Sequence, residues 1–515
     1  MKFNDITLSL KSGRKIVEHL TFTLSQQDKL AIIGEEGNGK STLIKFIYDK
    51  NLIKDYCYFS GNTDISKDSI GYLEQTFSFE WYSFGAMDYL ITRQPEETPQ
   101  YEIYNQIYEI ETLCKKFNLD LNILDENRKI NTLSGGEKLK LQFIKILFYQ
   151  PELILLDEPT NDIDLETLKL FEECILSIST PIIYVSHDET LLSNTATIIL
   201  HLEQIKRKTE MKFTLIKMDY SSYIQLRARQ LEQQNRDAYR TRKEKEEKKQ
   251  NLMHLHLLVE NDLDRAVRDP TWGRILAKKM KNIKAMEKKL EHIPIIDYAQ
   301  PEEAIHIFFT PSIIFPNGKT IIHLQDFTLG MNNQILAEKI NLKIVGPKHI
   351  CIIGKNGCGK TTLLKHIYAK IKEKTEIKLG YMPQCYEDEL NIELSTVAYL
   401  QEELGYDNII KSKIMSTLGA MNFQNHEMQA KIKDLSGGQK AKLLLAKMIL
   451  TERTVLLLDE PTRNLSPLSN PVIRSILKEF KGAIICVTHD RKLIEEIADE
   501  AYELTPDGLE QVNIS

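Results

Sequence analysis

The chain has 515 residues, which is too long for a single hydrophobic core and predicts two to four domains. Hydrophobic residues make up 42%, charged residues 27% and the net charge is -6, while no apolar stretch approaches the roughly 18 residues of a membrane span, which argues against a membrane protein. Its seven cysteines are scattered without a CxxC pair, which argues against a zinc site and a disulfide framework.

The first residues, MKFNDITLSL, predict a strand and lack the charged and apolar regions of a signal peptide, so we expect a cytoplasmic protein. The apolar strand KLAII then leads into GEEGNGKS, which matches GxxxxGK[ST] between a strand and a helix. Such a loop cradles phosphates with backbone N–H groups, so we expect Lys40 to contact the β- and γ-phosphates and Ser41 to bind Mg²⁺. The charges of Glu35 and Glu36 should weaken triphosphate binding unless both side chains point outward.

Further motifs follow in the first half. Gln75 ends GYLEQ after a strand and is a candidate for binding Mg²⁺ or positioning water, and an LSGG motif covers 133–136. The buried strand of ILLDE ends in Asp157, a candidate Mg²⁺ ligand through water, and Glu158 is positioned to polarise the attacking water. His187 ends IIYVSH, where a neutral imidazole can sense the γ-phosphate. Each of these alone is also compatible with an ordinary turn, packing or capping residue.

The middle of the chain predicts a basic helical hairpin. Residues 223–258 contain no Gly or Pro, and apolar positions recur at spacings of three and four from Trp272 to Leu290, which predicts two helices of up to about 35 residues and about 50 Å. The breaker Asp269–Pro270 predicts a tip near 258–271. Residues 223–291 hold 18 Lys or Arg against 11 Asp or Glu, which favours a polyanionic partner, although a solvated helical face is the commoner reason for charge runs.

The second half repeats the first. HICII precedes GKNGCGKT, followed by GYMPQ with Gln384, an LSGG motif, LLLDE with Asp459 and Glu460, and IICVTH ending in His489. The last three motifs lie 302 residues after their first copies. Apolar strands alternating with helical patterns predict an α/β fold: two tandem domains at 1–210 and 305–515, joined by a hairpin at 211–304.

This ordered motif set resembles the ATP-binding cassette family of P-loop NTPases over about four fifths of the chain. The resemblance implies an ATPase that uses ATP and Mg²⁺, in which each LSGG closes over the nucleotide held by the other domain. In site one it implies ATP-binding residues Gly34, Glu35, Glu36, Gly37, Asn38, Gly39, Lys40, Ser41, Thr42, Gln75, Ser436, Gly437 and Gly438, with catalytic Glu158 and His187 and metal ligands Ser41, Gln75 and Asp157. In site two it implies Gly354, Lys355, Asn356, Gly357, Cys358, Gly359, Lys360, Thr361, Thr362, Gln384, Ser134, Gly135 and Gly136, with catalytic Glu460 and His489 and metal ligands Thr361, Gln384 and Asp459.

Two cassettes joined by a basic hairpin resemble the ABC-F subfamily of ribosome-binding ATPases. The resemblance implies a monomer with paired cassettes that binds the 70S ribosome, with 23S rRNA and P-site tRNA as contacts and no membrane or DNA partner. The resemblance also implies that the hairpin enters the tRNA exit site and approaches the peptidyl-transferase centre. The contacts predicted for the hairpin are Arg240, Arg242, Lys243, Lys248, Lys249, His254, His256, Arg265, Arg268, Trp272, Lys278, Lys279 and Lys281. Trp272 and its leucine neighbours are as readily explained by closing the hairpin core.

Some features depart from the family. Leu8 and Leu10, or Leu329 and Met331, stand where an aromatic residue usually stacks on adenine. Asp164 of the first half is replaced by Ser466 in the second, which predicts asymmetric communication between the sites, with residues 463–466 on the less tightly coupled side.

The wording TRNLSPLS resembles antibiotic-resistance members, and the 25 residues after Asp490 leave no room for a separate C-terminal domain. Protection against lincosamides, pleuromutilins and streptogramins A is therefore the favoured role. A housekeeping translation factor of the same subfamily is the first alternative, and the nucleotide-binding subunit of an ABC transporter is the second.

Overall fold

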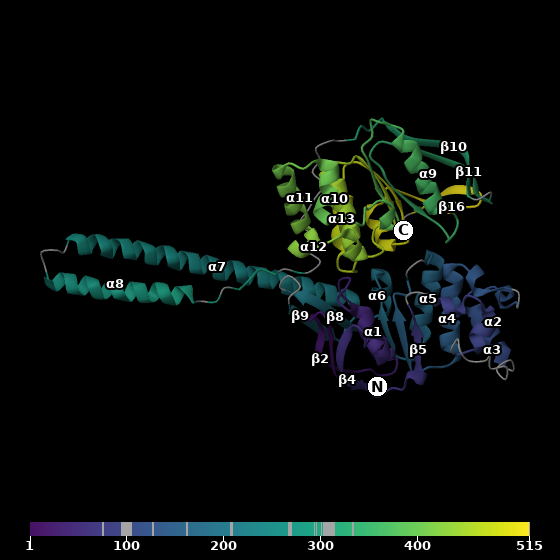
Figure 1. Cartoon of the computed structure of the whole chain (residues 1–515), viewed down its shortest axis with the longest axis horizontal. Coiled ribbons are helices and arrows are strands. Elements are labelled where there is room, and N and C mark those ends of the chain that lie inside the picture. The colour runs from purple at the N-terminus through teal and green to yellow at the C-terminus, as the bar shows by residue number, and fades with distance from the viewer. Residues whose placement is uncertain are drawn as a thin grey trace. The chain divides into compact units, whose positions relative to one another are not determined.

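The computed structural model describes most of the chain, with side chains except at 263–265, 270 and 271; the described residues are 1–74, 77–93, 106–125, 128–160, 163–205, 210–265, 270–292, 294, 296–299, 301, 315–331 and 334–513. It divides into two compact units. One unit contains both Met1–Tyr220, called the first half here, and Glu302–Ser515, the second half. The other unit is the hairpin Ser221–Pro301. The helices and strands are drawn in Figure 1.

The first half is built around a six-stranded sheet with the order β5-β6-β7-β3-β8-β9, in which all neighbours are parallel except β8 and β9. Antiparallel strands in the order β2-β1-β4 form a second sheet. The elements are β1 (Lys2–Leu10), β2 (Lys15–Thr23), β3 (Lys29–Ile33), α1 (Lys40–Tyr48), β4 (Cys57–Thr63), β5 (Ile70–Leu73), α2 (Ala86–Ile91), α3 (Ile107–Lys116), α4 (Gly135–Phe148), β6 (Leu153–Asp157), α5 (Leu165–Ser177), β7 (Ile182–Val185), α6 (Glu189–Thr195), β8 (Ile198–Ile205) and β9 (Glu210–Ile216).

The second half repeats this plan, with the sheet order β13-β14-β15-β12-β16-β17 and a separate antiparallel pair β10-β11. Its elements are β10 (Thr320–Met331), β11 (Gln334–Val345), β12 (His349–Ile353), α9 (Lys360–Lys372), β13 (Leu379–Met382), α10 (Thr396–Leu404), α11 (Asn408–Ala420), α12 (Asn425–Gln429), α13 (Gly437–Leu450), β14 (Val455–Asp459), α14 (Asn470–Lys478), β15 (Ala483–Val487), α15 (Arg491–Ile497), β16 (Glu500–Thr505) and β17 (Gly508–Val512). The predicted α/β fold with two P-loop domains is confirmed.

The central strands of both sheets are buried on both faces. All five residues of β3 and β6 in the first half, and of β14 and β15 in the second, are buried, which is typical of parallel strands covered by helices. Their side chains join two hydrophobic cores in the second half and one in the first half that also includes β1 and β2. These rigid strands fix the positions of the loops at their carboxyl ends.

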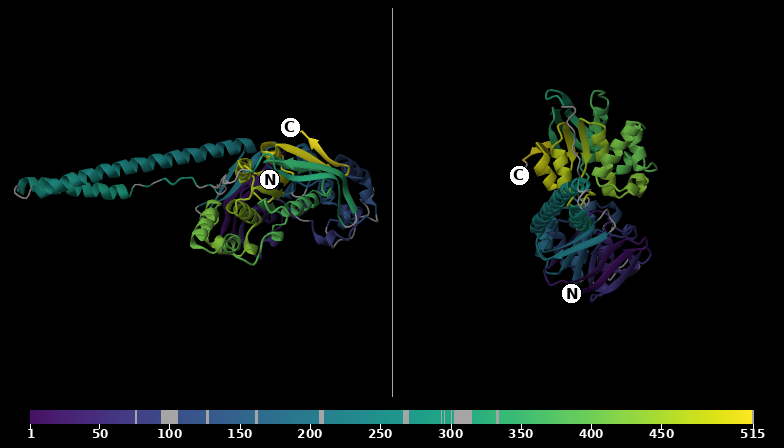
Figure 2. Two further views of the ribbon diagram at one scale, coloured as in Figure 1. Left: turned by 90° about the horizontal axis from the view of Figure 1, so that it is seen from above. Right: turned by 90° about the vertical axis from the view of Figure 1, so that its left-hand side faces the viewer.

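The hairpin unit consists of α7 (Tyr220–Arg265) and α8 (Pro270–Glu291), which run side by side in Figures 1 and 2. The first helix continues past the end predicted near Leu258, and at 46 residues it is about 69 Å long. The second begins at Pro270, as expected because proline suits the first turn of a helix. Among the described residues, no helix combines the length and hydropathy that a membrane crossing requires.

A small apolar core joins the two hairpin helices. It consists of Val259, Leu276 and Ile283, with Leu252 and Met280 packed against it. The leucines near the tip are not part of this core, since Leu255, Leu257 and Leu258 are about half exposed (48%, 51% and 47%). Trp272 is 47% exposed as well, so the hairpin covers these side chains only in part.

Candidate functional site

Three adjacent strands bring the predicted catalytic motifs together in each half. The phosphate loop follows β3 or β12, the acidic pair ends β6 or β14, and the histidine comes two residues after β7 or β15. Because these strands are parallel neighbours, their carboxyl ends meet at one edge of the sheet. The equal sheet orders place the repeated motifs at equivalent positions in the two halves.

Each phosphate loop is a turn that excludes side chains at its first glycine. Gly34 and Gly354 have φ of 145° and 147°, and a Cβ atom there would collide with the backbone carbonyl of Leu202 or Leu504. Lys360 Nζ donates to Gly354 O at 2.8 Å, and Lys40 makes the equivalent bond to Gly34 O at 2.8 Å. Both ammonium groups are buried in the loops that the helices α1 and α9 follow.

The aspartates at the strand ends are buried carboxylates. Asp157 and Asp459 are each 1% exposed, and Asp157 accepts a hydrogen bond from Ser41 Oγ at 2.9 Å. Burial raises the pKa of Asp157 to about 6 and also raises that of Asp459. Within the described part of the chain, neither carboxylate oxygen of Asp459 has a hydrogen-bond partner, which is costly unless a cation compensates the charge.

The residues around Asp459 fit Mg²⁺. Thr361 and Gln384 line the same cavity as Asp459, so a hydroxyl, an amide oxygen and a carboxylate converge. Mg²⁺ prefers this kind of oxygen set and is usually held by one or two carboxylates together with substrate phosphates. Ser41 and Asp157 are in direct contact in the first half. Gln75, the remaining predicted ligand, lies outside the described residues.

The glutamates after the aspartates have an unusual backbone. Glu158 and Glu460 both have φ of 51°, the left-handed region that residues other than glycine rarely adopt. The amide N–H of each continues the sheet, since Glu158 donates to Val185 O at 3.0 Å and Glu460 to Val487 O at 2.9 Å. Such strain concentrates at functional sites, and its repetition supports a common role for both side chains.

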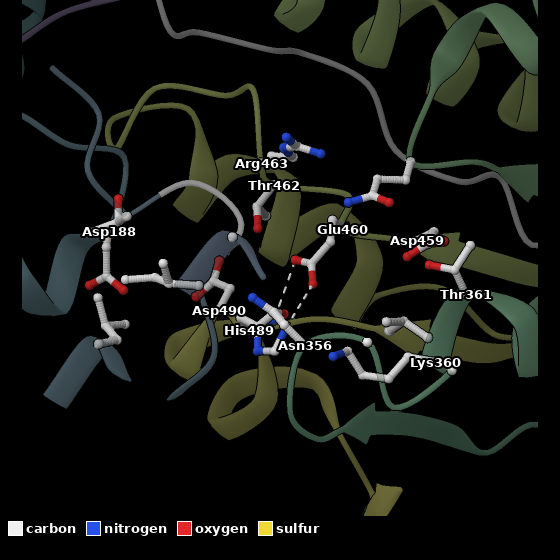
Figure 3. Close-up of a pocket in the computed structure, with 18 of the residues that line it drawn as sticks. Asp188, Asn356, Lys360, Thr361, Asp459, Glu460, Thr462, Arg463, His489 and Asp490 are labelled. Carbon is white, nitrogen blue, oxygen red and sulfur yellow. Dashed lines mark hydrogen bonds and ion pairs between the residues drawn. The ribbon is translucent and has the colours of Figure 1, made fainter. Parts of the chain in front are cut away.

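Each glutamate faces the predicted histidine. His187 Nε2 lies 2.9 Å from Glu158 Oε1, whereas His489 Nε2 lies 3.8 Å from Glu460 Oε1. The His489 amide donates to Glu460 Oε2 at 3.3 Å (Figure 3). Burial raises the pKa of Glu460 to about 8 and lowers that of His489 to about 4. A basic carboxylate beside a neutral imidazole is suited to accept a proton from water.

A cavity of about 440 Å³ unites the predicted residues of site two with the first half. From the second half, its lining includes Lys360, Thr361, Asp459, Glu460 and His489. From the first half it includes Gly135, Thr160, Ile163, Leu168, His187 and Asp188. Figure 3 shows Lys360, Asp459 and Glu460 gathered around this space. The structure therefore brings a signature glycine of one half to the phosphate loop of the other.

The expected adenine position is lined by aliphatic side chains. Met331 and Leu336 line the site-two cavity, and Thr362 Oγ1 lies 3.7 Å from Met331 Sδ. Leu329 and Leu8 are buried in the cores of their halves, so they do not face a ligand. A flexible thioether in place of an aromatic ring offers contact without ring stacking.

Two other predicted loop residues support the fold of the loop. Asn38 is 3% exposed and donates from Nδ2 to Leu202 O at 3.0 Å, which ties the loop to β8. Cys358 lies in the equivalent place, where its Sγ is 3.1 Å from the Cβ position that Gly354 lacks. Neither residue is among those that line the site-two cavity.

The signature motifs are helix N-termini with capping boxes. Ser134 and Ser436 are the N-caps of α4 and α13, and they exchange hydrogen bonds with Glu137 and Gln439 respectively. The two glycines that follow each serine occupy the first turn, where amide groups have no partner within the helix. Such amides are suited to bind an anion.

In site one these amides contact the opposite phosphate loop. Gly437 N donates to Glu36 Oε1 at 3.1 Å, and Gly438 N donates to Glu36 Oε2. Glu35 accepts hydrogen bonds from the hydroxyls of Ser466 and Ser469. Both acidic side chains of the first phosphate loop therefore point towards the second half. The sequence predicted that their charges weaken triphosphate binding unless both side chains point outward.

Buried ion pairs also join the halves, and one of them reaches Asp188, which lines the site-two cavity. Arg474 Nη1 lies 2.6 Å from Glu189 Oε1, with side chains 3% and 6% exposed, and Arg491 pairs with Glu172 at 3.0 Å and Asp188 at 3.3 Å. These contacts and the one from Ser466 to Glu35 join the halves directly, whereas the weaker coupling expected of residues 463–466 stays a prediction. Sequence reasoning missed the ion pairs, because neither arginine belongs to a repeated motif.

Replacing Arg474 with Met is expected to destabilise the chain by about 3 kcal/mol, because the Glu189 carboxylate would remain buried without its main partner. The measurement is the midpoint of urea unfolding. Lys431→Met is the matched control, since Lys431 pairs with Glu393 on the surface, where such pairs contribute about 0 to 1 kcal/mol. Equal midpoint shifts for the two variants would contradict a structural role for the buried pair.

The predicted hairpin contacts are mostly exposed. Arg240 and Arg242 pair with the acidic groups of Glu244 (2.9 Å) and Asp297 (3.5 Å), and His256 Nδ1 lies 2.9 Å from Glu287 Oε1. The side chains of Lys243, Lys248, Lys249, His254, Trp272, Lys278, Lys279 and Lys281 are exposed. Arg268 lies outside the described residues, and the side chain of Arg265 is not described.

Comparison with known proteins matches both halves to one family. The family model described as "ABC transporter" matches residues 17–161 and 337–463. Curated relatives include the ATP-binding protein Uup of Buchnera aphidicola, 28% identical over 98% of this chain and 80% of that protein. Another is ABC transporter F family member 5 of Arabidopsis thaliana, 27% identical over 99% of this chain and 75% of that protein. These names confirm the predicted resemblance to the ABC-F group.

Solved structures support the same fold. An archaeal ribosome recycling factor aABCE1, in complex with the ribosomal stalk protein aP1, has a TM-score of 0.55 at 18% identity and covers 94% of this chain and 84% of that chain. A ribosome-bound archaeal Pelota and ABCE1 structure has a TM-score of 0.52 at 16% identity, with 95% of this chain and 75% of that chain covered.

Proposed function

Because the chain belongs to the ATP-binding cassette family, which makes it an ATP-binding protein with ATPase machinery, we propose that it is a cytoplasmic ribosome-binding ATPase of the ABC-F type. ATP bound between the halves closes them, and hydrolysis lets them reopen. The closed form binds the 70S ribosome at the tRNA exit site, where the hairpin contacts 23S rRNA and P-site tRNA. The proposed domain limits remain 1–210, 211–304 and 305–515.

At site two, the proposed chemistry uses the chain's own groups as follows. Lys360 and the loop amides bind the phosphates, and Gly135 approaches them from the other half. Glu460 accepts the proton of the attacking water through its carboxylate, while His489 stays neutral beside it. Mg²⁺ held by Thr361, Gln384 and Asp459 supplies charge neutralisation for the phosphates when bound.

The observation that carries the ribosome proposal is the hairpin, an exposed basic arm between two acidic halves. A transporter subunit has no use for such an arm, whereas rRNA phosphates attract it. Its exposed apolar side chains, including Leu255, Leu257 and Trp272, are available to stack on or contact nucleotides near a tip. We further propose that this contact protects the ribosome against lincosamides, pleuromutilins and streptogramins A.

Changing Lys278, Lys279 and Lys281 together to Gln is expected to weaken ribosome binding. The slope of log K against log salt concentration should become shallower by about 0.7 for each phosphate contact that is lost. Binding is measured by co-sedimentation with 70S ribosomes and ATP over a series of salt concentrations. The control replaces three exposed lysines of the second half, Lys411, Lys413 and Lys481. If both triple variants behave alike, the hairpin has no special role in binding.

The same variants test protection. A sensitive host that expresses the unaltered chain should gain resistance to at least one of the three drug classes, and the hairpin variant should lose that gain. The control variant should keep it. An unaltered chain that changes susceptibility to none of the three classes would remove the protection role and favour a general translation factor.

A further inference from the structure

The two phosphate loops differ at the positions that face the opposite half. Glu35 and Glu36 in the first loop stand where Lys355 and Asn356 stand in the second. The charge of the loop is therefore reversed between the sites. The structure shows what each acidic side chain contacts.

Glu36 occupies the N-terminus of the opposite signature helix. Its two carboxylate oxygens accept hydrogen bonds from the amides of Gly437 and Gly438 in the first turn of α13. The approach is so close that a Cβ atom on Gly438 would lie 3.0 Å from Glu36 Oε2. At the equivalent glycine of the other signature, Gly136, the same test meets only Thr167 Oγ1 at 3.8 Å.

Glu35 holds the loop in this position. Its carboxylate accepts from Ser466 Oγ and Ser469 Oγ at 2.5 Å each, and Lys442 Nζ lies 3.6 Å away. Burial alone would raise the pKa of Glu35, but Lys442 and the two hydroxyls hold it below its usual value, so the group stays charged. Ser466 stands where the first half has Asp164. An aspartate at position 466 would repel Glu35.

At site two the corresponding contacts have the opposite polarity. Lys355 Nζ lies 3.0 Å from Glu166 Oε2, and both side chains are largely exposed. The loop thus presents a cation and an amide towards the first half. Lys355 and Asn356 therefore add no negative charge to the phosphate loop that the first turn of α4 approaches.

A terminal phosphate and a carboxylate compete for the same place. Amides at a helix N-terminus favour an anion, and in the paired arrangement they would face the third phosphate of a bound nucleotide. In site one these amides already bind an anion of the protein itself, the carboxylate of Glu36. A second anion close to the Glu36 carboxylate would be repelled by its charge.

We propose that Glu36 takes the place of the terminal phosphate at site one, so that this site accepts a nucleoside diphosphate and leaves ATP hydrolysis to site two. This proposal rests on the two nucleotide sites of the proposed function. The phosphate loop itself is intact, with Lys40 buried as Lys360 is, so two phosphates still find their cradle. Site one then serves as a clasp that stays closed while site two cycles.

The test measures nucleotide binding at site one by calorimetry in the full chain, with site two disabled by Lys360→Ala. Unaltered site one should bind ADP at least as tightly as a non-hydrolysable ATP analogue. Changing Glu36 to Asn, the residue found at 356, should tighten binding of the analogue by about tenfold, or about 1.4 kcal/mol. The dissociation constant of ADP should change by less than about twofold. Retained ADP binding also shows that the variant is folded.

The reverse exchange is the matched control. In a Lys40→Ala chain, Asn356→Glu should weaken binding of the analogue at site two by about tenfold and spare ADP. The proposal is overturned if unaltered site one prefers the analogue over ADP, if it binds neither, or if Glu36→Asn shifts both equally. Failure of site two to bind the analogue in the Lys40→Ala chain would instead contradict the nucleotide sites of the proposed function.

Discussion

Changing Glu460 to Gln is expected to lower steady-state ATP hydrolysis by about a thousandfold, the scale of a lost general base. The amide keeps the size of the side chain and its hydrogen bond from the His489 amide, but it cannot accept a proton from water. Because burial raises the pKa of Glu460 to about 8, its carboxylate form is a stronger base than an exposed one, and that form gains population as the pH rises towards 8. Release of inorganic phosphate under saturating ATP measures the effect.

The control for this substitution is Glu452→Gln. Glu452 shares the left-handed backbone of Glu460, with φ of 51°, but it is exposed and lies outside the site-two cavity. Its loss of charge should leave hydrolysis within about twofold of the unaltered rate, because surface changes rarely exceed 0.5 kcal/mol. Hydrolysis by the Glu460→Gln chain within about tenfold of the unaltered rate would contradict its assignment as the base.

The fold could be predicted in large part because its signals are local and occur twice. An apolar strand followed by a glycine loop fixes β3 and β12, and a buried strand ending in two acids fixes β6 and β14. Since both copies have the same order, the strands had to occupy equivalent sheets. The end of α7 was placed too early, because the Asp269–Pro270 breaker predicted a tip that begins near 258, whereas Val259 continues the apolar face of the helix.

The nucleotide sites were predictable as sets of residues but not as contacts. Sequence spacing identified Asp459, Glu460 and His489, which the structure places around one cavity. It could not identify the target of Glu36, which lies 401 residues away along the chain. Nor could it identify Arg474, since its partner Glu189 is on a different half. Pairing between halves is a tertiary property that neither composition nor periodicity encodes.

The same limit applies to the surroundings of residue 466. Loss of the aspartate at position 466 was expected to loosen one side of the interface. In the structure the serine that replaces it donates to Glu35, and Ser469 donates to the same carboxylate. The two changes compensate each other, which is visible only when both halves are seen together.

Changing Glu158 and Glu460 together to Gln is expected to hold the chain on ribosomes in the presence of ATP. Both substitutions keep the phosphate loops and the signature helices, so ATP can still close the halves. Hydrolysis at site two can then no longer reopen the halves, because its candidate base is gone, and Glu158→Gln removes the equivalent carboxylate of site one. The closed state should accumulate, and with it the form that binds the ribosome.

Co-sedimentation of this double variant with 70S ribosomes tests the central claim most directly. The account predicts that most of the protein pellets with ribosomes in ATP and that little does so without nucleotide or in the Lys360→Ala chain, where ATP cannot bind site two. Absence of the double variant from the ribosomal pellet in ATP, with ATP binding intact, would contradict the claim that this chain is a ribosome-binding ATPase.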